Sequence, residues 1–259
     1  GHVGFWAVGS YTYTILLMNG TDFFVAMLAG GLAAALSGLI LGLPTLKLKG
    51  HYIAIASLGF TVIIHSLALN LTDLTRGPLG IPGIPRPIIF GHSFSNIFDF
   101  FLLNAGITII CAVIIFRLLH SPWGKILETI REDEVATKSL AKNSFVYKLQ
   151  AFVVSAFFAG IAGATASSFY GYIGGHSAFF IPQLIIFLSI VMIGGAGSFW
   201  GSVIGAIIIV TMYEGVRYLP IEAGIVGPVQ QGAYALVLIL IMIFRPRVIM
   251  GRKVKSFQR

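Results

Sequence analysis

The chain has 259 residues, of which 57% are hydrophobic and only 10% are charged. Soluble globular domains usually contain about 45–50% apolar and about 25% charged residues, so this composition excludes a soluble domain and predicts an all-α, polytopic integral membrane protein. The net charge of +8 does not indicate nucleic-acid binding, because the basic residues gather in short stretches between apolar runs, as is typical of membrane topology. The single cysteine, Cys111, lies inside an apolar run and excludes a disulfide framework or a thiolate metal cluster.

Eight apolar runs approach the roughly 20 residues that cross a bilayer. The predicted membrane segments are residues 3–19, 23–43, 51–71, 97–119, 149–171, 180–193, 199–213 and 229–244. They form one predicted transmembrane domain over residues 1–259. The first segment begins without a Met, a charged leader or a signal cleavage site, so we expect a truncated N-terminus.

Small residues recur at every fourth position in two of these segments. This spacing places them on one helix face, where they allow the backbones of two helices to approach closely in lipid. The two rows are Gly30, Ala34, Gly38 and Gly42, and Ala156, Gly160 and Ala164.

The basic residues predict the orientation of the chain in the membrane. The turn at Lys47 and Lys49, residues 117–148 and the tail 245–259 together hold 14 of the 17 lysines and arginines. Because such residues are enriched on the cytoplasmic side, we expect all three stretches to be cytoplasmic. Residues 72–96, which are rich in Pro and Gly, then form an outer loop.

Residues 121–148 are a polar insert between two apolar segments. Ser121 and Pro122 suit the cap and the first position of a helix, and we expect one amphipathic helix with an apolar stripe on one side. Pairs such as Glu128 with Arg131 would lie on its polar side. This helix could lie on the lipid surface or dock into a groove on a partner protein, and its periodicity is compatible with both. The predicted stripe consists of Ile126, Leu127, Ile130, Val135 and Leu140.

Segments 180–193 and 199–213 are short for a full crossing and are joined by the sequence GGAGSFWG. This pattern predicts broken helices, whose ends often lie beside a permeation pathway. Spacing would place Gly197, Gly201 and Gly205 on one helix face, which fits either a packing seam or a pathway lining. The candidate pathway or helix-break residues are Gly194, Gly195, Gly197, Ser198, Gly201 and Gly205.

The sequence contains no phosphate-binding loop, no paired-His metal motif and no nucleophile elbow. We therefore expect no catalytic residue, no metal site and no bound cofactor in this chain. Acidic residues are also absent from the middle of the apolar segments, whereas carriers coupled to protons or sodium usually need such groups there. We expect the energy for any transport to come from another subunit.

Three stretches resemble one family of membrane proteins. The longest is GKILETIREDEVATKSLAKNSFVYKLQAFVVSAFFAGIAGA, and the others are GLPTLKLKGHYIAIASLGF and IVMIGGAGSFWGSVIGA. They resemble the M-type (LivM-like) permease subunit of branched-chain amino acid ABC importers, in the binding-protein-dependent inner membrane component family. The start of the chain resembles a segment that follows one or two further helices in that family. Ala141 stands where relatives usually have Gly, so the turn there would need Asn143 in a left-handed conformation or another geometry.

The resemblance implies a transporter of several subunits in the bacterial inner (plasma) membrane. Its other parts would be a second, H-type permease subunit, two cytosolic ATP-binding subunits that use ATP and Mg, and an extracytoplasmic substrate-binding protein. Residues 124–143 would form the segment that couples to an ATP-binding subunit. The implied coupling residues are Gly124, Ile126, Leu127, Ile130, Arg131, Glu132, Asp133, Glu134, Val135 and Leu140.

Several alternatives stay open on the sequence. The outer loop 72–96 is either a docking surface for the binding protein or a rigid connector that covers helix ends. Related permeases carry urea, short amides or other amino acids. A secondary transporter, a channel or a membrane-embedded enzyme would need intramembrane groups that the sequence does not display.

Overall fold

The computed structural model describes residues 1–48, 51–89, 92–94, 96–139, 142–174, 181–195 and 197–216, together with residues 229, 230, 232 and 236. The chain divides into two compact units, Gly1–Phe180 and Ile181–Arg259. Leu140, most of segment 229–244 and the tail 245–259 lie outside the described residues.

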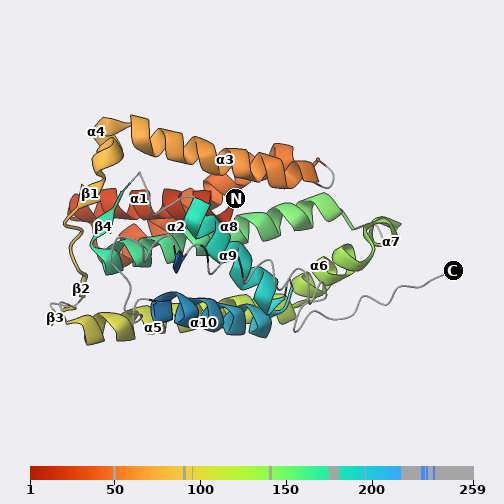
Figure 1. The fold of residues 1–259 in the computed structure, drawn as a ribbon. Helices are drawn as coiled ribbons and strands as arrows, with labels where there is room; N and C mark the ends of the chain where they lie inside the picture. Colours follow the sequence, from red (N-terminus) through yellow and green to blue (C-terminus); the bar gives the residue numbers. More distant parts are fainter. Residues whose placement is uncertain are drawn as a thin grey trace. The chain divides into compact units, whose positions relative to one another are not determined.

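The first unit is built mainly of helices, several of them long enough to cross a membrane (Figure 1). Its helices are α1 (His2–Met18), α2 (Phe23–Thr45), α3 (His51–Asn70), α4 (Thr72–Thr75), the 3-10 helix η1 (Gly77–Leu79), α5 (Ile97–His120), α6 (Pro122–Glu132), α7 (Glu134–Ser139) and α8 (Ser144–Tyr170). Its strands have two residues each: β1 (Ile81–Pro82), β2 (Ile88–Ile89), β3 (His92–Ser93) and β4 (Tyr172–Ile173). The second unit contains α9 (Ile181–Gly194) and α10 (Phe199–Val216).

Seven of the eight predicted membrane segments coincide with helices, namely α1, α2, α3, α5, α8, α9 and α10. Helices α2, α5 and α8, with Tyr52–Asn70 of α3, are long and apolar enough to cross a bilayer on their own. The predicted polytopic α-helical fold is therefore confirmed.

Polar side chains fix the points at which three long helices begin. Asp22 accepts a hydrogen bond from the backbone N–H of Phe24 at the start of α2, and Asn96 does the same for Phe98 at the start of α5. Asn143 accepts one from the N–H of Val146 at the start of α8. These contacts satisfy backbone donors that the first helical turn leaves without a partner. Asn143 has φ −77°, so it does not take the left-handed conformation considered for this turn.

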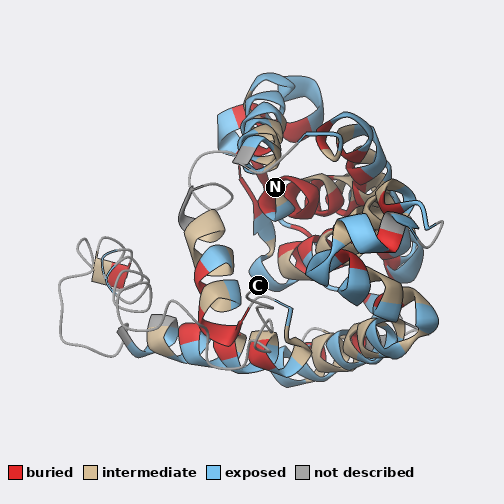
Figure 2. Cartoon of the chain, turned by 90° about the vertical axis from the view of Figure 1, so that its right-hand side faces the viewer, coloured by how far each residue is buried: buried red, intermediate tan, exposed pale blue. Residues whose placement is uncertain are grey.

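Helices α1, α2 and α8 form the centre of the first unit through close backbone contacts. A Cβ added to Gly160 of α8 would lie 2.5 Å from the Cβ of Ala34 and 2.9 Å from the carbonyl oxygen of Gly30, both on α2. A Cβ on Gly9 of α1 would overlap the backbone of Gly160. As a result α1, the helix beside the N label in Figure 2, is mostly buried. Both predicted rows of small residues are confirmed as packing seams.

Large side chains fill the space around this seam. The ring of Phe5 on α1 is fully buried, with its centroid 4.9 Å from that of Phe60 on α3 and 5.4 Å from that of Phe152 on α8. On the same helix, the hydroxyl of Tyr13 forms a buried hydrogen bond with Ser168 of α8. Aromatic packing thus adds α3 to the three-helix centre, while a polar contact fixes α1 against α8.

The outer-loop sequence is held against the end of α8. Strand β1 pairs antiparallel with β4, so that Ile81 lies opposite Ile173. The N–H of Ile84 donates to the carbonyl of Gly171, and the hydroxyl of Tyr172 donates to the carbonyl of Leu79 at 3.2 Å. The short strands lie at one end of the first unit and α6 and α7 at the other (Figure 1). The predicted outer loop and the predicted cytoplasmic insert thus occupy opposite ends.

Replacing Gly160 with Ala should destabilise the protein by about 1–3 kcal/mol, because the new methyl group would overlap Ala34 and the backbone of α2. The matched control is Gly106→Ala on α5, where an added Cβ meets nothing within 4 Å. We expect that control to change stability by no more than about 1 kcal/mol. Thermal unfolding of both variants in detergent measures the difference. Equal melting temperatures would contradict a close α2–α8 contact.

Candidate functional site

The polar insert begins with a sharp turn between α5 and α6. Ser121 accepts a hydrogen bond from the N–H of Gly124, and Pro122 is the first helical residue, as predicted. Gly124 is buried, and a Cβ at this position would overlap the carbonyl oxygen of Leu119. Glycine is required here because the last turn of α5 passes directly over the first turn of α6.

The apolar stripe of α6 packs on its own chain. Ile130 is only 6% exposed, while Ile126 and Leu127 are half-buried. On the same helix, the indole N–H of Trp123 donates to the side-chain oxygen of Gln150 on α8 at 2.9 Å. The expectation that this stripe docks into a partner is therefore wrong for Ile130, because the amphipathic helix covers its apolar side with α5 and α8.

The insert contains two helices where one was predicted. Asp133 is extended, with φ −151° and ψ 103°, and its carboxylate accepts hydrogen bonds from the N–H groups of Val135 and Ala136, each at 2.9 Å. An Asp side chain competes with the helical hydrogen-bond pattern and favours a new helix start. Val135 consequently leaves the stripe of Ile130 and is 76% exposed.

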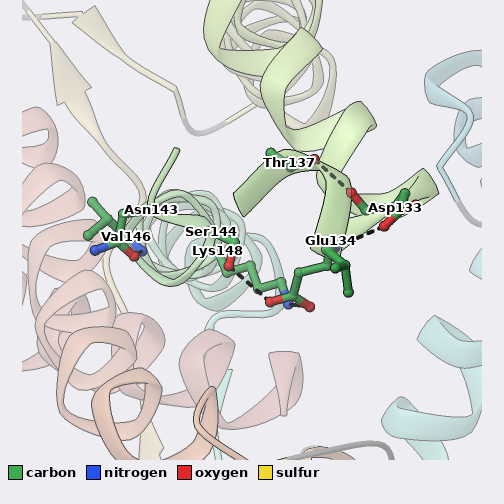
Figure 3. A network of polar contacts seen from close by, with 8 residues as sticks. Asp133, Glu134, Thr137, Asn143, Ser144, Val146 and Lys148 are labelled. Carbon is green, nitrogen blue, oxygen red and sulfur yellow. Dashed lines mark hydrogen bonds and ion pairs between the residues drawn. The ribbon is translucent and has the colours of Figure 1, made fainter. Parts of the chain in front are cut away.

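Glu134 connects the second short helix to the membrane segment that follows (Figure 3). Its carboxylate forms an ion pair with Lys148 at 2.5 Å and accepts a hydrogen bond from the hydroxyl of Ser144 at 2.9 Å. Both partners belong to the first two turns of α8. We call these three residues the α7–α8 clamp. No sequence pattern indicates it, because Glu134 lies 10 and 14 positions before its partners and on a separate helix.

The other side of the insert is exposed. It carries four of the ten predicted coupling residues, whereas Ile126 and Leu127 are half-buried and Ile130 is buried. Exposed charged groups beside one exposed apolar side chain are typical of a polar interface with a small apolar centre. Among the described side chains from 131 to 139, the exposed residues are Arg131, Glu132, Asp133, Val135, Ala136 and Ser139.

The glycine-rich break lies between α9 and α10. Gly195 and Gly197 have φ of +100° and +88°, values that other residues rarely adopt, and the Ser198 hydroxyl accepts a hydrogen bond from the N–H of Gly201 at 3.1 Å. Gly197 thus belongs to the turn and does not share a helix face with Gly201 and Gly205, contrary to our expectation.

Gly201 and Gly205 bring α10 against α9. A Cβ on Gly201 would overlap the carbonyl oxygen of Gly194, and one on Gly205 would overlap that of Ile190. Ile193 and Ile209 are buried beside this contact. These two glycines therefore form a packing seam inside the second unit.

Among the described residues, no group of three or more His, Cys, Asp and Glu side chains is placed to hold a metal ion.

Comparisons with known proteins agree with a polytopic membrane permease. Residues 1–245 match the family described as the branched-chain amino acid transport system permease component. The chain is 36% identical over 241 residues to the high-affinity branched-chain amino acid transport system permease protein LivM of Escherichia coli, which covers 84% of this chain and 56% of the relative. The chain is 35% identical to the LivM protein of Salmonella typhimurium, over 84% of this chain and 56% of that relative. A probable LivM protein of Methanocaldococcus jannaschii is 21% identical over 71% of this chain and 53% of its own length.

The chain therefore belongs to the branched-chain amino acid transport permease family and is an integral membrane protein. It spans about half the length of the curated relatives that it matches. No solved structure matches it.

Single cysteines at Ser139 on α7 and Thr72 on α4, in a Cys111→Ser background, should react with membrane-impermeant thiol reagents from opposite sides of the membrane. Both positions are exposed and lie at opposite ends of the first unit. Labelling of intact cells and of inside-out vesicles measures the side. Labelling of both cysteines from the same side would contradict the predicted topology.

Glu134→Gln should loosen α7 without unfolding the chain. The ion pair is partly exposed, so its loss should cost less than about 1 kcal/mol of global stability. Amide hydrogen exchange over residues 134–139 should nevertheless become faster, because α7 loses its charged contact with α8. Exchanging the two charges, Glu134→Lys with Lys148→Glu, should restore protection. The control is Glu132→Gln, an exposed carboxylate on α6, and equal exchange in Glu134→Gln and wild type would contradict the clamp.

Proposed function

We propose that this chain is the transmembrane permease subunit of an ATP-binding-cassette importer that moves branched-chain amino acids across the inner (plasma) membrane into the cytoplasm. Family membership and the names of the relatives support this class of transport. The observation that carries the mechanism is the polar insert: two short helices lie outside the membrane segments, cover their apolar side with their own chain and present an exposed polar side.

Energy for transport comes from partner subunits in this proposal. The sequence contains no phosphate-binding loop, so two cytosolic subunits would bind Mg and ATP and hydrolyse it. One of them would contact the exposed side of α6 and α7, with Val135 as its apolar anchor. Arg131 and Glu132 would contribute polar contacts at the edge of this interface.

Movement of the insert would reach the membrane helices by a short route. The α7–α8 clamp joins α7 to Ser144 and Lys148 at the start of α8. Helix α8 then packs closely on α1 and α2 at Gly160, which faces Gly9 and Ala34. Because closely packed helices move as units, a displacement at the start of α8 would shift its contacts with both neighbours.

A binding protein would deliver the cargo at the opposite end. The loop after α3 is pinned to β4, and it exposes Leu79, which is 82% accessible, and Ile88, which is 64% accessible. Apolar side chains held on a fixed backbone suit docking, since little conformational freedom is lost on binding. A second, H-type permease subunit would complete the pathway.

Val135→Asp should weaken association with the ATP-binding subunit by more than about tenfold, because loss of a central apolar contact commonly costs about 2 kcal/mol or more. The matched control is Leu79→Asp, which places the same charge on an exposed apolar residue at the other end. That variant should keep the ATP-binding subunit and lose association with the binding protein. Pull-down of each partner, together with ATP-driven uptake of leucine and of urea into proteoliposomes, measures both effects.

Val135→Asp should lose the ATP-binding subunit and Leu79→Asp should lose the binding protein, so each variant is a control for the other. Retention of the ATP-binding subunit and of uptake by Val135→Asp would contradict the proposed interface. Uptake of urea in place of leucine would correct the cargo, and uptake without any ATP-binding subunit would indicate a secondary transporter or channel.

A further inference from the structure

The half of α5 that leads to the polar insert has an exposed apolar side. Ile109, Ile110 and Val113 are 49–62% exposed. At about 100° per residue they fall within an arc of about 100° around the helix, and Arg117 and His120 of the last turns lie on the same arc. One side of this helix therefore changes from apolar to basic as it approaches the insert.

This side of α5 differs from the packing seams of the unit. Helices that associate in lipid do so through small residues, as Gly160 does where it meets Gly9 and Ala34. Between Ile109 and His120 the exposed arc of α5 carries only large side chains. Such a surface suits the flexible acyl chains of lipids better than the close approach of another helix.

Three exposed basic residues lie where α5 ends and the insert begins. They are Arg117 and His120 on α5 and Lys125 on α6. Lys125 follows Gly124, where an added Cβ would overlap the carbonyl oxygen of Leu119. This contact holds the first turn of α6 directly against the last turn of α5, so the basic residues of both helices gather at one corner.

Nearby acidic groups do not neutralise this corner. The sequence has no acidic residue between Arg117 and Lys125, and the next one along the chain is Glu128. Within the described part of the chain, neither Arg117 nor Lys125 takes part in an ion pair. Lys148, by contrast, is paired with Glu134. The corner therefore attracts a negatively charged partner.

Trp123 places this corner at the boundary between lipid and water. Its indole N–H donates to the side-chain oxygen of Gln150 on α8, and the residue is half-buried. Tryptophan is enriched at the level of the lipid headgroups, because its ring is apolar and its N–H is polar. Arg117 lies one turn before the end of α5, and from there a long basic side chain reaches the headgroups while its stem stays in the apolar region.

We propose that this side of α5, together with Lys125, binds an anionic phospholipid of the cytoplasmic leaflet. The guanidinium of Arg117 and the ammonium group of Lys125 would donate hydrogen bonds to the lipid phosphate. An acyl chain would lie along Ile110 and Val113. Because the lipid would contact both α5 and α6, it would stabilise the turn from which the insert begins. The proposal concerns the membrane around the chain and holds whichever solute the chain moves.

Native mass spectrometry of the full chain in neutral detergent tests this proposal, with phosphatidylglycerol and phosphatidylcholine of equal acyl length as the two lipids. Wild type should bind phosphatidylglycerol more tightly and melt at a higher temperature in its presence. Arg117→Gln should weaken that binding by about fivefold, the contribution of one basic residue near an anionic membrane surface. It should leave the affinity for phosphatidylcholine unchanged. Arg117→Lys keeps the charge and should retain most of the preference.

Lys47→Gln is the matched control, because it removes one positive charge from an exposed residue on the predicted cytoplasmic side. Lys47 lies 6.0 Å from the centroid of the Phe145 ring, at the junction of α2 and α8 and not on α5. Its loss should change the affinity for phosphatidylglycerol by less than about twofold. An equal loss in Lys47→Gln and Arg117→Gln would show a diffuse charge effect and overturn the site, as would equal affinity of wild type for the two lipids.

The same titration on the chain bound to a second permease subunit decides between lipid and protein on this side of α5. Retention of the phosphatidylglycerol preference, and of its loss in Arg117→Gln, would support a lipid site. Disappearance of the preference in that complex would assign the side to the second subunit and overturn the proposal.

Discussion

The first unit depends on the close approach of the α1, α2 and α8 backbones. In lipid, apolar side chains gain little by leaving one apolar environment for another, so dispersion contacts between closely spaced backbones become a main source of helix association. Gly160 makes this approach possible because it has no side chain where α8 meets Gly9 of α1 and Gly31 of α2. Helix α3 is added to this centre by longer side chains, as the contact of Phe60 with Phe5 shows.

The position of α8 gives it contacts with both ends of the unit. Its first turns hold the clamp residues Ser144 and Lys148, its middle contains Gly160, and the residues that follow its last turn form β4, which pairs with the loop after α3. A single rigid element therefore touches the polar insert, the centre of the membrane bundle and the predicted outer surface. This continuity is the physical basis for the proposed route from α7 to the membrane helices.

Buried hydroxyls on α1 differ in whether the packing of the helices satisfies them. Tyr13 and Ser168 satisfy each other and stabilise the bundle, while the hydroxyls of Ser10, Tyr11 and Thr14 are buried without hydrogen-bond partners. The Ser10 hydroxyl lies against Gly163 of α8, so the close approach of the two helices buries this group without supplying an acceptor or donor.

The sequence by itself determined the class of the protein, the positions of the membrane helices and the two seams of small residues. These features follow from composition and from spacing along one helix, which need no knowledge of neighbours. Proline and serine at Ser121–Pro122 likewise placed the start of α6. Within the polar insert, however, local periodicity suggested a single helix and an available apolar stripe.

Only the tertiary structure decided which side of the insert is exposed and which side its own chain covers. Asp133 divides the helix because its carboxylate binds two backbone N–H groups, a preference that competes with helix continuation and is not resolved by spacing. Ile130 is buried because α8 folds back against α6, whereas Val135 is exposed because the break at Asp133 separates it from the stripe. The same return of the chain brings Lys148 to Glu134. Such contacts join residues without any periodic relation, so a sequence pattern carries no signal for them. The three-dimensional path of α8 therefore determines the clamp and the exposed side of the insert.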